Sequence, residues 1–129
     1  MEKIVLAERY LVNKKEILKT ETTFTSVEEI ESYLKAEIEK HPVAAYIATF
    51  DHYAHTKNLD GMIPRDVLGA LNVMCCFGMA IPNAEFMAIK PMSIAVVEKD
   101  ENFVMSFIEA PAPSAQQAMS TWIAGIKNK

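Results

Sequence analysis

The stretch "SIAVVEKDENFVMSFIE", residues Ser93 to Glu109, decides the fold. It holds two short runs of β-branched and aromatic residues, Ser93 to Glu98 and Asn102 to Glu109, and such runs are typical of strands. The polar link "KDE" between them is short enough to join neighbouring strands into an antiparallel hairpin. The sequence therefore predicts a sheet in which at least these two strands pair locally.

Further strands are predicted on the N-terminal side of this hairpin. "VAAYIATF" (Val43 to Phe50) has the same apolar, β-branched character. "LNVMCCF" (Leu71 to Phe77) fits either a strand or part of a helical stripe that begins at Pro64, and we interpret it as a helical turn over Pro64 to Leu68 followed by a strand. "RYLVNKKEILKTETTF" (Arg9 to Phe24) predicts one or two strands, and its charges favour a place at an edge of the sheet.

Two capping boxes predict two main helices. In "SVEE", Ser26 and Glu29 can exchange hydrogen bonds with each other's backbone N–H, which predicts a helix over Val27 to Lys40. Its buried stripe is Val27, Ile30, Leu34 and Ile38. The second box, "SAQQ" at Ser114 to Gln117, opens a closing helix. The buried stripe of that helix is Ala115, Ala118, Met119, Trp122, Ile123 and Ile126.

These elements predict one α+β domain over residues 1–129. We expect a single antiparallel or mixed sheet of about four to six strands, with two main helices on one face. The composition, 50% hydrophobic and 23% charged, is that of a globular protein. The net charge is −4 and the basic residues are scattered, so the sequence argues against nucleic acid as a partner.

The N-terminus and the cysteines predict a cytosolic protein. "MEKIVLAERYLV" carries charges within its apolar stretch and has no small-residue cleavage site, unlike a signal peptide. No run is long and apolar enough to span a membrane, so no membrane partner is expected. Cys75 and Cys76 are neighbours and cannot form an ordinary disulfide with each other, which favours reduced thiols.

The apolar strands also predict an assembly. Val43 to Phe50, Val73 to Phe77, Ile94 to Val97 and Phe103 to Ile108 are almost wholly apolar, so both of their faces need cover. Two helices can cover one face. The other can be covered by curling of the sheet into a partial barrel, by the segment from Gly78 to Pro91, or by a second subunit. We predict a homodimer through this face, because large bare apolar patches are rare on monomers.

The polar stretch "FDHYAHT" (Phe50 to Thr56) suggests a metal site. We expect Phe50 to close a buried strand and the residues beyond it to form a polar turn in which His52 and His55 can converge. Asp51 can supply a carboxylate, and Cys76 a thiolate. A set of His52, His55 and one cysteine would leave an open fourth position on zinc or another transition metal, as in catalytic sites. The competing interpretation makes Asp51 and His52 caps of the strand end and the cysteines core residues.

The sequence also contains residues for two other kinds of site. A cysteine nucleophile with His52 or His55 as its base is disfavoured, because the apolar neighbours in "NVMCCFGM" raise the pKa of a thiol. The methionine-rich segment "GMAIPNAEFMAIKPM" (Gly78 to Met92) resembles a flap over an apolar cavity, although an ordinary loop has the same composition. A ligand pocket is expected to involve Tyr53, Met79 and Met87.

The stretch "HPVAAYIATFDHYAHT" (His41 to Thr56), with "CFG" (Cys76 to Gly78) and "SFIEAP" (Ser106 to Pro111), resembles a group of small bacterial proteins of no assigned function. The resemblance implies a bacterial origin and carries no catalytic or ligand roles. We therefore expect a dimeric, non-catalytic domain that binds a small molecule or a protein. The alternative is a metal-dependent enzyme with a His/Asp/Cys site.

Overall fold

The computed structural model describes residues 1–129 as one six-stranded sheet with three helices. The strands are β1 (Glu2–Leu6), β2 (Tyr10–Leu18), β3 (Ala44–Asp51), β4 (Val67–Phe77), β5 (Met92–Lys99) and β6 (Asn102–Ile108). The helices are α1 (Val27–Lys40), α2 (His52–Asn58) and α3 (Pro113–Ala124), with short 3-10 turns η1 (Lys19–Glu21) and η2 (Glu85–Ile89). None of the helices has the length and apolarity needed to cross a membrane.

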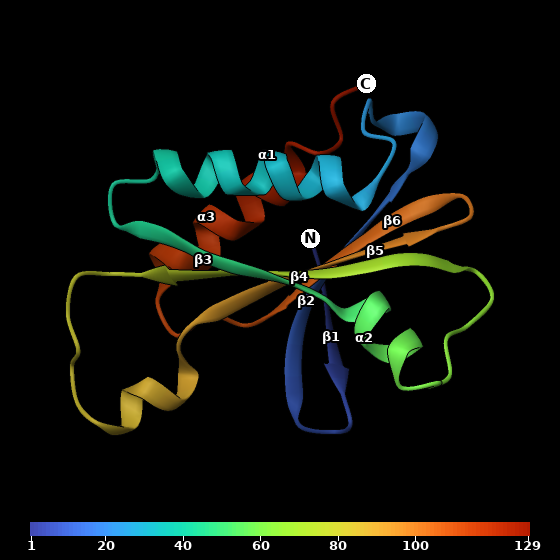
Figure 1. Ribbon diagram of the computed structural model, residues 1–129. Helices are drawn as coiled ribbons and strands as arrows, with labels where there is room; N and C mark the ends of the chain where they lie inside the picture. Colours follow the sequence, from blue (N-terminus) through green and yellow to red (C-terminus); the bar gives the residue numbers. More distant parts are fainter.

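The sheet is antiparallel throughout, with the strand order β1-β2-β6-β5-β4-β3. In Figure 1, α1 and α3 lie on the same side of the sheet, whereas α2, η2 and the turn between β1 and β2 project from the other side. The predicted α+β fold, with two main helices on one face, is therefore confirmed. The predicted β5–β6 hairpin is present, with Ala95 paired to Ser106.

The core lies between the sheet and the two main helices. Alternate residues of β4, Leu71, Val73, Cys75 and Phe77, are buried, as period-two burial of one sheet face requires. They pack into one cluster with residues of β5, β6, α1 and α3. The intervening residues of β4 are only half-buried. We call this second side of the sheet, opposite α1 and α3, the open face.

Helix α1 has the predicted boundaries and the predicted buried stripe. The backbone N–H of Glu29 donates to Ser26 Oγ at 3.2 Å, which is one half of the capping box. The Glu29 carboxylate reaches the backbone N–H of Thr25, at 2.6 Å, one residue before the N-cap. Both bonds satisfy N–H groups at the start of the helix.

Helix α3 differs from its prediction at its first turn. Its N-cap is Ala112, no side chain caps it, and Pro113 occupies the first turn, where a missing N–H costs nothing. Ser114 therefore does not cap the helix, because the helix begins two residues earlier than "SAQQ" indicates. The predicted buried stripe is confirmed, with Ala118 partly buried at its margin.

Strand β4 begins earlier than expected. Residues Pro64 to Val67 form a turn closed by a bond from the Val67 N–H to the Pro64 carbonyl at 3.1 Å, and the strand starts at Val67. The predicted helical turn is wrong because pairing with β5, which extends from Val67 to Cys75, supplies backbone partners that a single helical turn could not.

The structure also differs from the prediction at both edges of the sheet. β3 is an edge strand, so Phe50 is 40% exposed and does not close a buried strand. At the other edge, β1 pairs outside β2, which places β2 one strand inward from the predicted edge position. β1 itself was not predicted, because its five residues "EKIVL" mix charge with a short apolar run.

The open face is covered in part by curling of the sheet. Leu6 of β1 and Asn72 of β4 line the same hollow of about 250 Å³, although β2, β6 and β5 lie between their strands. The turn between β1 and β2 therefore leans over the open face. Of the three kinds of cover expected from the sequence, curling and the segment from Gly78 to Pro91 both contribute within one chain.

Candidate ligand cleft

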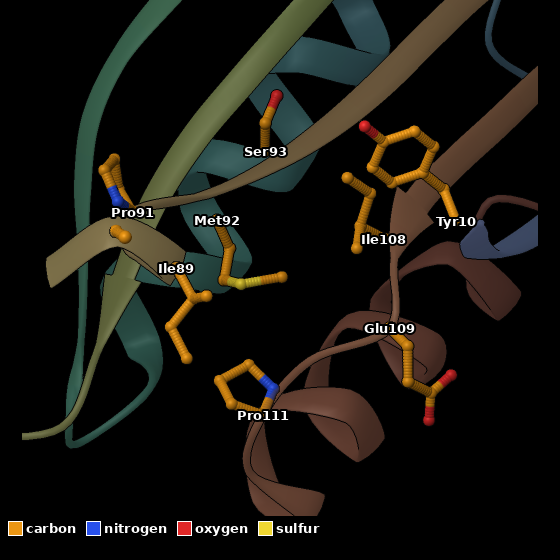
Figure 2. Close-up of a pocket in the computed structure, with 9 residues that line it drawn as sticks. Tyr10, Ile89, Pro91, Met92, Ser93, Ile108, Glu109 and Pro111 are labelled. Carbon is orange, nitrogen blue, oxygen red and sulfur yellow. The ribbon is translucent and has the colours of Figure 1, made fainter. Parts of the chain in front are cut away.

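A cleft of about 510 Å³ lies where the curled hairpin, the segment around η2 and the end of β6 meet. Figure 2 shows the side chains that surround it. Nine residues line it: Tyr10, Ala88, Ile89, Pro91, Met92, Ser93, Ile108, Glu109 and Pro111. Its volume is within the range of small-molecule sites, which are mostly apolar with a few polar groups.

The lining comes from three separate parts of the chain. Tyr10 begins β2, Ile89 ends η2, and Pro111 lies in the connection between β6 and α3. Strand pairing fixes Met92 and Ser93, whereas the two connecting segments contribute apolar walls. A rigid sheet floor with walls from loops is the usual construction of a binding site.

The one charged residue of the lining, Glu109, is already neutralised. Its Oε1 accepts hydrogen bonds from Asn13 Nδ2 at 3.0 Å and from Lys3 Nζ at 3.1 Å. The Asn13 amide, followed by the Lys3 ammonium, lowers the pKa of Glu109 and keeps it ionised at neutral pH. In Figure 2 its carboxylate points away from the apolar side chains. The cleft thus offers no free charge to a ligand.

Asn13 itself is fully buried and completes a network at this end of the sheet. It exchanges hydrogen bonds with Gln116 of α3, including Gln116 Nε2 to Asn13 Oδ1 at 2.8 Å. Gln116 Oε1 also accepts from the Ala110 N–H at 3.0 Å. Because β2, α3 and the end of β6 are joined in this way, the rim of the cleft at Glu109 is held in place.

A row of polar side chains runs across the open face to the cleft. His52 Nδ1 lies 3.1 Å from Asn72 Oδ1, and Asn72 Nδ2 donates to Ser93 Oγ at 3.3 Å. We call His52, Asn72 and Ser93 the polar row. Ser93 lines both the cleft and the neighbouring hollow under Leu6, so the row ends at the junction of these two spaces.

The structure does not assemble the expected metal ligands. No group of three or more His, Cys, Asp or Glu side chains converges in it. The rings of His52 and His55 are near each other, with centroids 6.3 Å apart, and both contact Phe50. Asp51 instead caps α2, its Oδ1 accepting from the Ala54 N–H at 2.9 Å.

Cys76 lies too far along the sheet to join the histidines. It pairs with Ala45 on β3, whereas Asn72, which contacts His52, pairs with Phe50. Cys76 lies four positions along the strand from Asn72, a distance of about 13 Å. The expected turn after Phe50 is a seven-residue helix, α2, which points the chain away from the cysteines.

The three residues expected to share a pocket are separated. Tyr53 lines a hollow of about 140 Å³ beside α2. Met79 and Met87 line two further spaces beside the segment from Gly78 to Pro91, of about 310 and 240 Å³. The segment from Gly78 to Pro91 does lie beside apolar cavities, as expected. It lines the main cleft, however, with Ile89 and Pro91 and not with Met79 or Met87.

Neither a cysteine nor a serine nucleophile is assembled. Cys75 is buried on the helix side of the sheet, and burial, with its neighbour Cys76, raises the pKa of its thiol to about 12. His52 is on the open face, so it cannot act as a base for Cys75. Asn72 stands between His52 and Ser93, whereas activation of a serine requires direct contact with the imidazole.

Sequence reasoning overlooked Asn72, Ser93 and Asn13. A signal was present for the first two, because Asn72 interrupts the apolar run "LNVMCCF" and Ser93 begins "SIAVVE". A polar residue inside a buried strand needs a partner. That the partners are on adjacent strands depends on the β4–β5 register, in which Asn72 pairs with Ala95 and Met74 with Ser93.

Comparison with known proteins places the chain in a family. A family model described as "Family of unknown function (DUF6858)" matches residues 1–128. This agrees with the expected resemblance to proteins of no assigned function. No curated protein and no solved structure matches the chain.

Proposed function

We propose that this chain, which belongs to the family of unknown function DUF6858, is a non-catalytic, cytosolic bacterial domain that binds a small, uncharged, mainly apolar molecule. The observation that carries the proposal is the cleft of about 510 Å³ between the hairpin, η2 and the end of β6. Its size suits a ligand of ordinary metabolite or drug dimensions. The proposal requires neither a metal nor another cofactor.

The charges at the cleft support an uncharged ligand. Glu109 is the only ionised group in the lining, and Lys3 already pairs with it. An anionic ligand would meet an unfavourable carboxylate and no free cation. A cationic ligand would have to compete with Lys3 and lose hydration among Ile89, Met92 and Pro111, which is costly for a charge.

The apolar lining supports a small molecule over a protein partner. The side chains of Ile89, Met92 and Ile108 surround a concave space, whereas most protein interfaces are broad and close to flat. Burial of a ligand's apolar area in such a space contributes about 25 cal/mol per Å². A ligand of modest size can therefore bind with micromolar affinity without any ionic contact.

The test is a titration with N-phenylnaphthylamine, an uncharged apolar dye whose emission rises on leaving water. We expect saturable binding to the wild-type protein. Ile108→Trp, which places an indole in the cleft, should weaken binding at least tenfold, about 1.4 kcal/mol. The matched control is Val5→Trp, because Val5 is also a strand residue of similar exposure, 62% against 56%, and lies outside the cleft.

Three results would contradict the proposal. One is the absence of saturable dye binding to the wild-type protein. The second is wild-type affinity in the Ile108→Trp protein, which would place the dye elsewhere. The third is equal weakening by both variants. Circular dichroism of each variant shows whether the fold is intact, so that a loss of binding can be assigned to the cleft.

A further inference from the structure

The polar row has a single direction of hydrogen-bond donation. An amide oxygen only accepts, so the contact at 3.1 Å between His52 Nδ1 and Asn72 Oδ1 requires a hydrogen on Nδ1. The amide nitrogen of Asn72 then donates to Ser93 Oγ. Each donor in the row therefore points from α2 towards the cleft.

This direction leaves the hydroxyl hydrogen of Ser93 without a partner. Ser93 Oγ accepts from Asn72 and donates to no group of the protein. A hydroxyl can accept and donate at once, and donation is strengthened when its oxygen already accepts a hydrogen bond. Ser93 lies at the junction of the cleft and the hollow under Leu6, so its free donor is available to a molecule in either space.

We propose that the cleft selects molecules with an uncharged carbonyl group, whose oxygen accepts the hydroxyl hydrogen of Ser93 while their apolar part fills the space between Ile89 and Ile108. This inference rests on the proposed function and names the chemical class of its ligand. Aldehydes, ketones, esters and amides of apolar compounds belong to this class.

The surroundings of Ser93 favour a carbonyl over a carboxylate. No cationic side chain lines the cleft or the hollow, and the carboxylate of Glu109 at the rim is paired with Lys3. Ala95, two residues along β5, and Ile108, on the adjacent strand, give the neighbourhood an apolar character. In such surroundings a neutral acceptor gains a hydrogen bond without the desolvation cost of a charge.

Two uncharged dyes separate the carbonyl contact from apolar binding. Prodan is a naphthyl ketone whose emission shifts to the red when its carbonyl accepts a hydrogen bond, whereas N-phenylnaphthylamine has no carbonyl. We expect Ser93→Ala to weaken Prodan binding about five- to tenfold, the value of one neutral hydrogen bond, and to leave N-phenylnaphthylamine binding unchanged. The emission of bound Prodan should shift to the blue in this variant.

Two further variants test the direction of the row. Asn72→Asp keeps the size of the side chain but makes it an acceptor for the Ser93 hydroxyl, so it should weaken Prodan binding as much as Ser93→Ala does. Ser106→Ala is the matched control, because Ser106 lines the same hollow as Ser93 but lies outside the polar row. It should leave the binding of both dyes unchanged.

The results that overturn this inference differ from those that overturn the proposed function. If the Ser93→Ala protein binds Prodan with wild-type affinity and emission, the carbonyl contact is wrong, while binding of N-phenylnaphthylamine in the cleft stands. Equal losses for both dyes in this variant would also overturn it. If N-phenylnaphthylamine does not bind the wild-type protein at all, the proposed function fails and this inference fails with it.

Discussion

The hydroxyl of Tyr33 on α1 occupies the space beside Gly125 in which a Cβ atom would lie. The same hydroxyl donates to the carbonyl of Trp122 at 2.7 Å, in the last turn of α3. Gly125 has φ −68°, a value open to any residue, so space and not backbone conformation favours glycine here. One hydroxyl thus joins the two helices that cover the core and determines which residue can end α3.

This relationship predicts coupling between two substitutions. Gly125→Ala should lower the free energy of unfolding by about 1 to 3 kcal/mol, as overpacking does. Tyr33→Phe should cost about 1 kcal/mol through loss of its hydrogen bond. In the double variant the methyl group gains space, so adding Gly125→Ala to Tyr33→Phe should cost almost nothing. Urea unfolding of the four proteins measures this, and costs that add within about 0.5 kcal/mol would contradict it.

The two cysteines should differ in reactivity. Cys75 has its pKa raised from 9.0 to about 12 by burial and by its neighbour, so its thiolate fraction near pH 8 should fall about a thousandfold. Cys76 is only partly buried, on the open face. We expect iodoacetamide to label the Cys75→Ala protein readily and the Cys76→Ala protein very slowly. Mass spectrometry follows the labelling, and equal rates in the native state would refute this expectation.

Acid titration should report on the network around Glu109. Its pKa is lowered first by Asn13 and then by Lys3, so the ionised form stabilises the fold above the ordinary pKa of 4.5, and this stability is lost as the pH falls through the lowered value. Asn13→Leu, which keeps the volume, should raise the pKa of Glu109 more than Lys3→Ala does. Carboxyl NMR measures both shifts, and the reverse order would show that Lys3 dominates.

The homodimer expected from the sequence stays a prediction. Apolar side chains remain exposed at both ends of the open face, with Leu6 at 50% and Phe50 at 40%. Light scattering at micromolar concentration should give twice the monomer mass. Phe50→Lys should shift the population to monomer, whereas Val5→Lys, on the helix side of β1, should not. A monomeric wild-type protein would contradict the predicted homodimer and would show that the curl of the sheet covers the open face sufficiently.

The elements that could be predicted are those with a local signal. Helix α1 was bounded by Ser26 at one end and by Pro42 beyond the other, and the hairpin of β5 and β6 by its short polar link. Periodicity identified the buried stripe of α3, because burial against one sheet face imposes a helical repeat. Its first turn was misplaced because the helix already begins at Pro113, and Gln117, the expected partner of Ser114 in a capping box, donates to Thr121 Oγ1 instead.

The site could not be predicted because it depends on distant pairings. The polar row requires the register of β4 against β5 and the short helix α2, and the cleft requires Tyr10 to approach Ile89 and Pro111. Proximity in sequence suggested that Asp51, His52 and His55 act together, whereas Asp51 satisfies the backbone of α2 and His52 bonds to Asn72. Local composition cannot distinguish these uses of one polar stretch.

Two connecting segments, the one around η2 and the link through Pro111, form walls of the cleft, while its floor belongs to the paired strands β5 and β6. No residue of the segment from Gly78 to Pro91 belongs to the buried core cluster, and neither does Pro111. If the proposed binding is correct, a change in the length of either segment would reshape the walls of the cleft and leave the helix-covered side of the sheet intact.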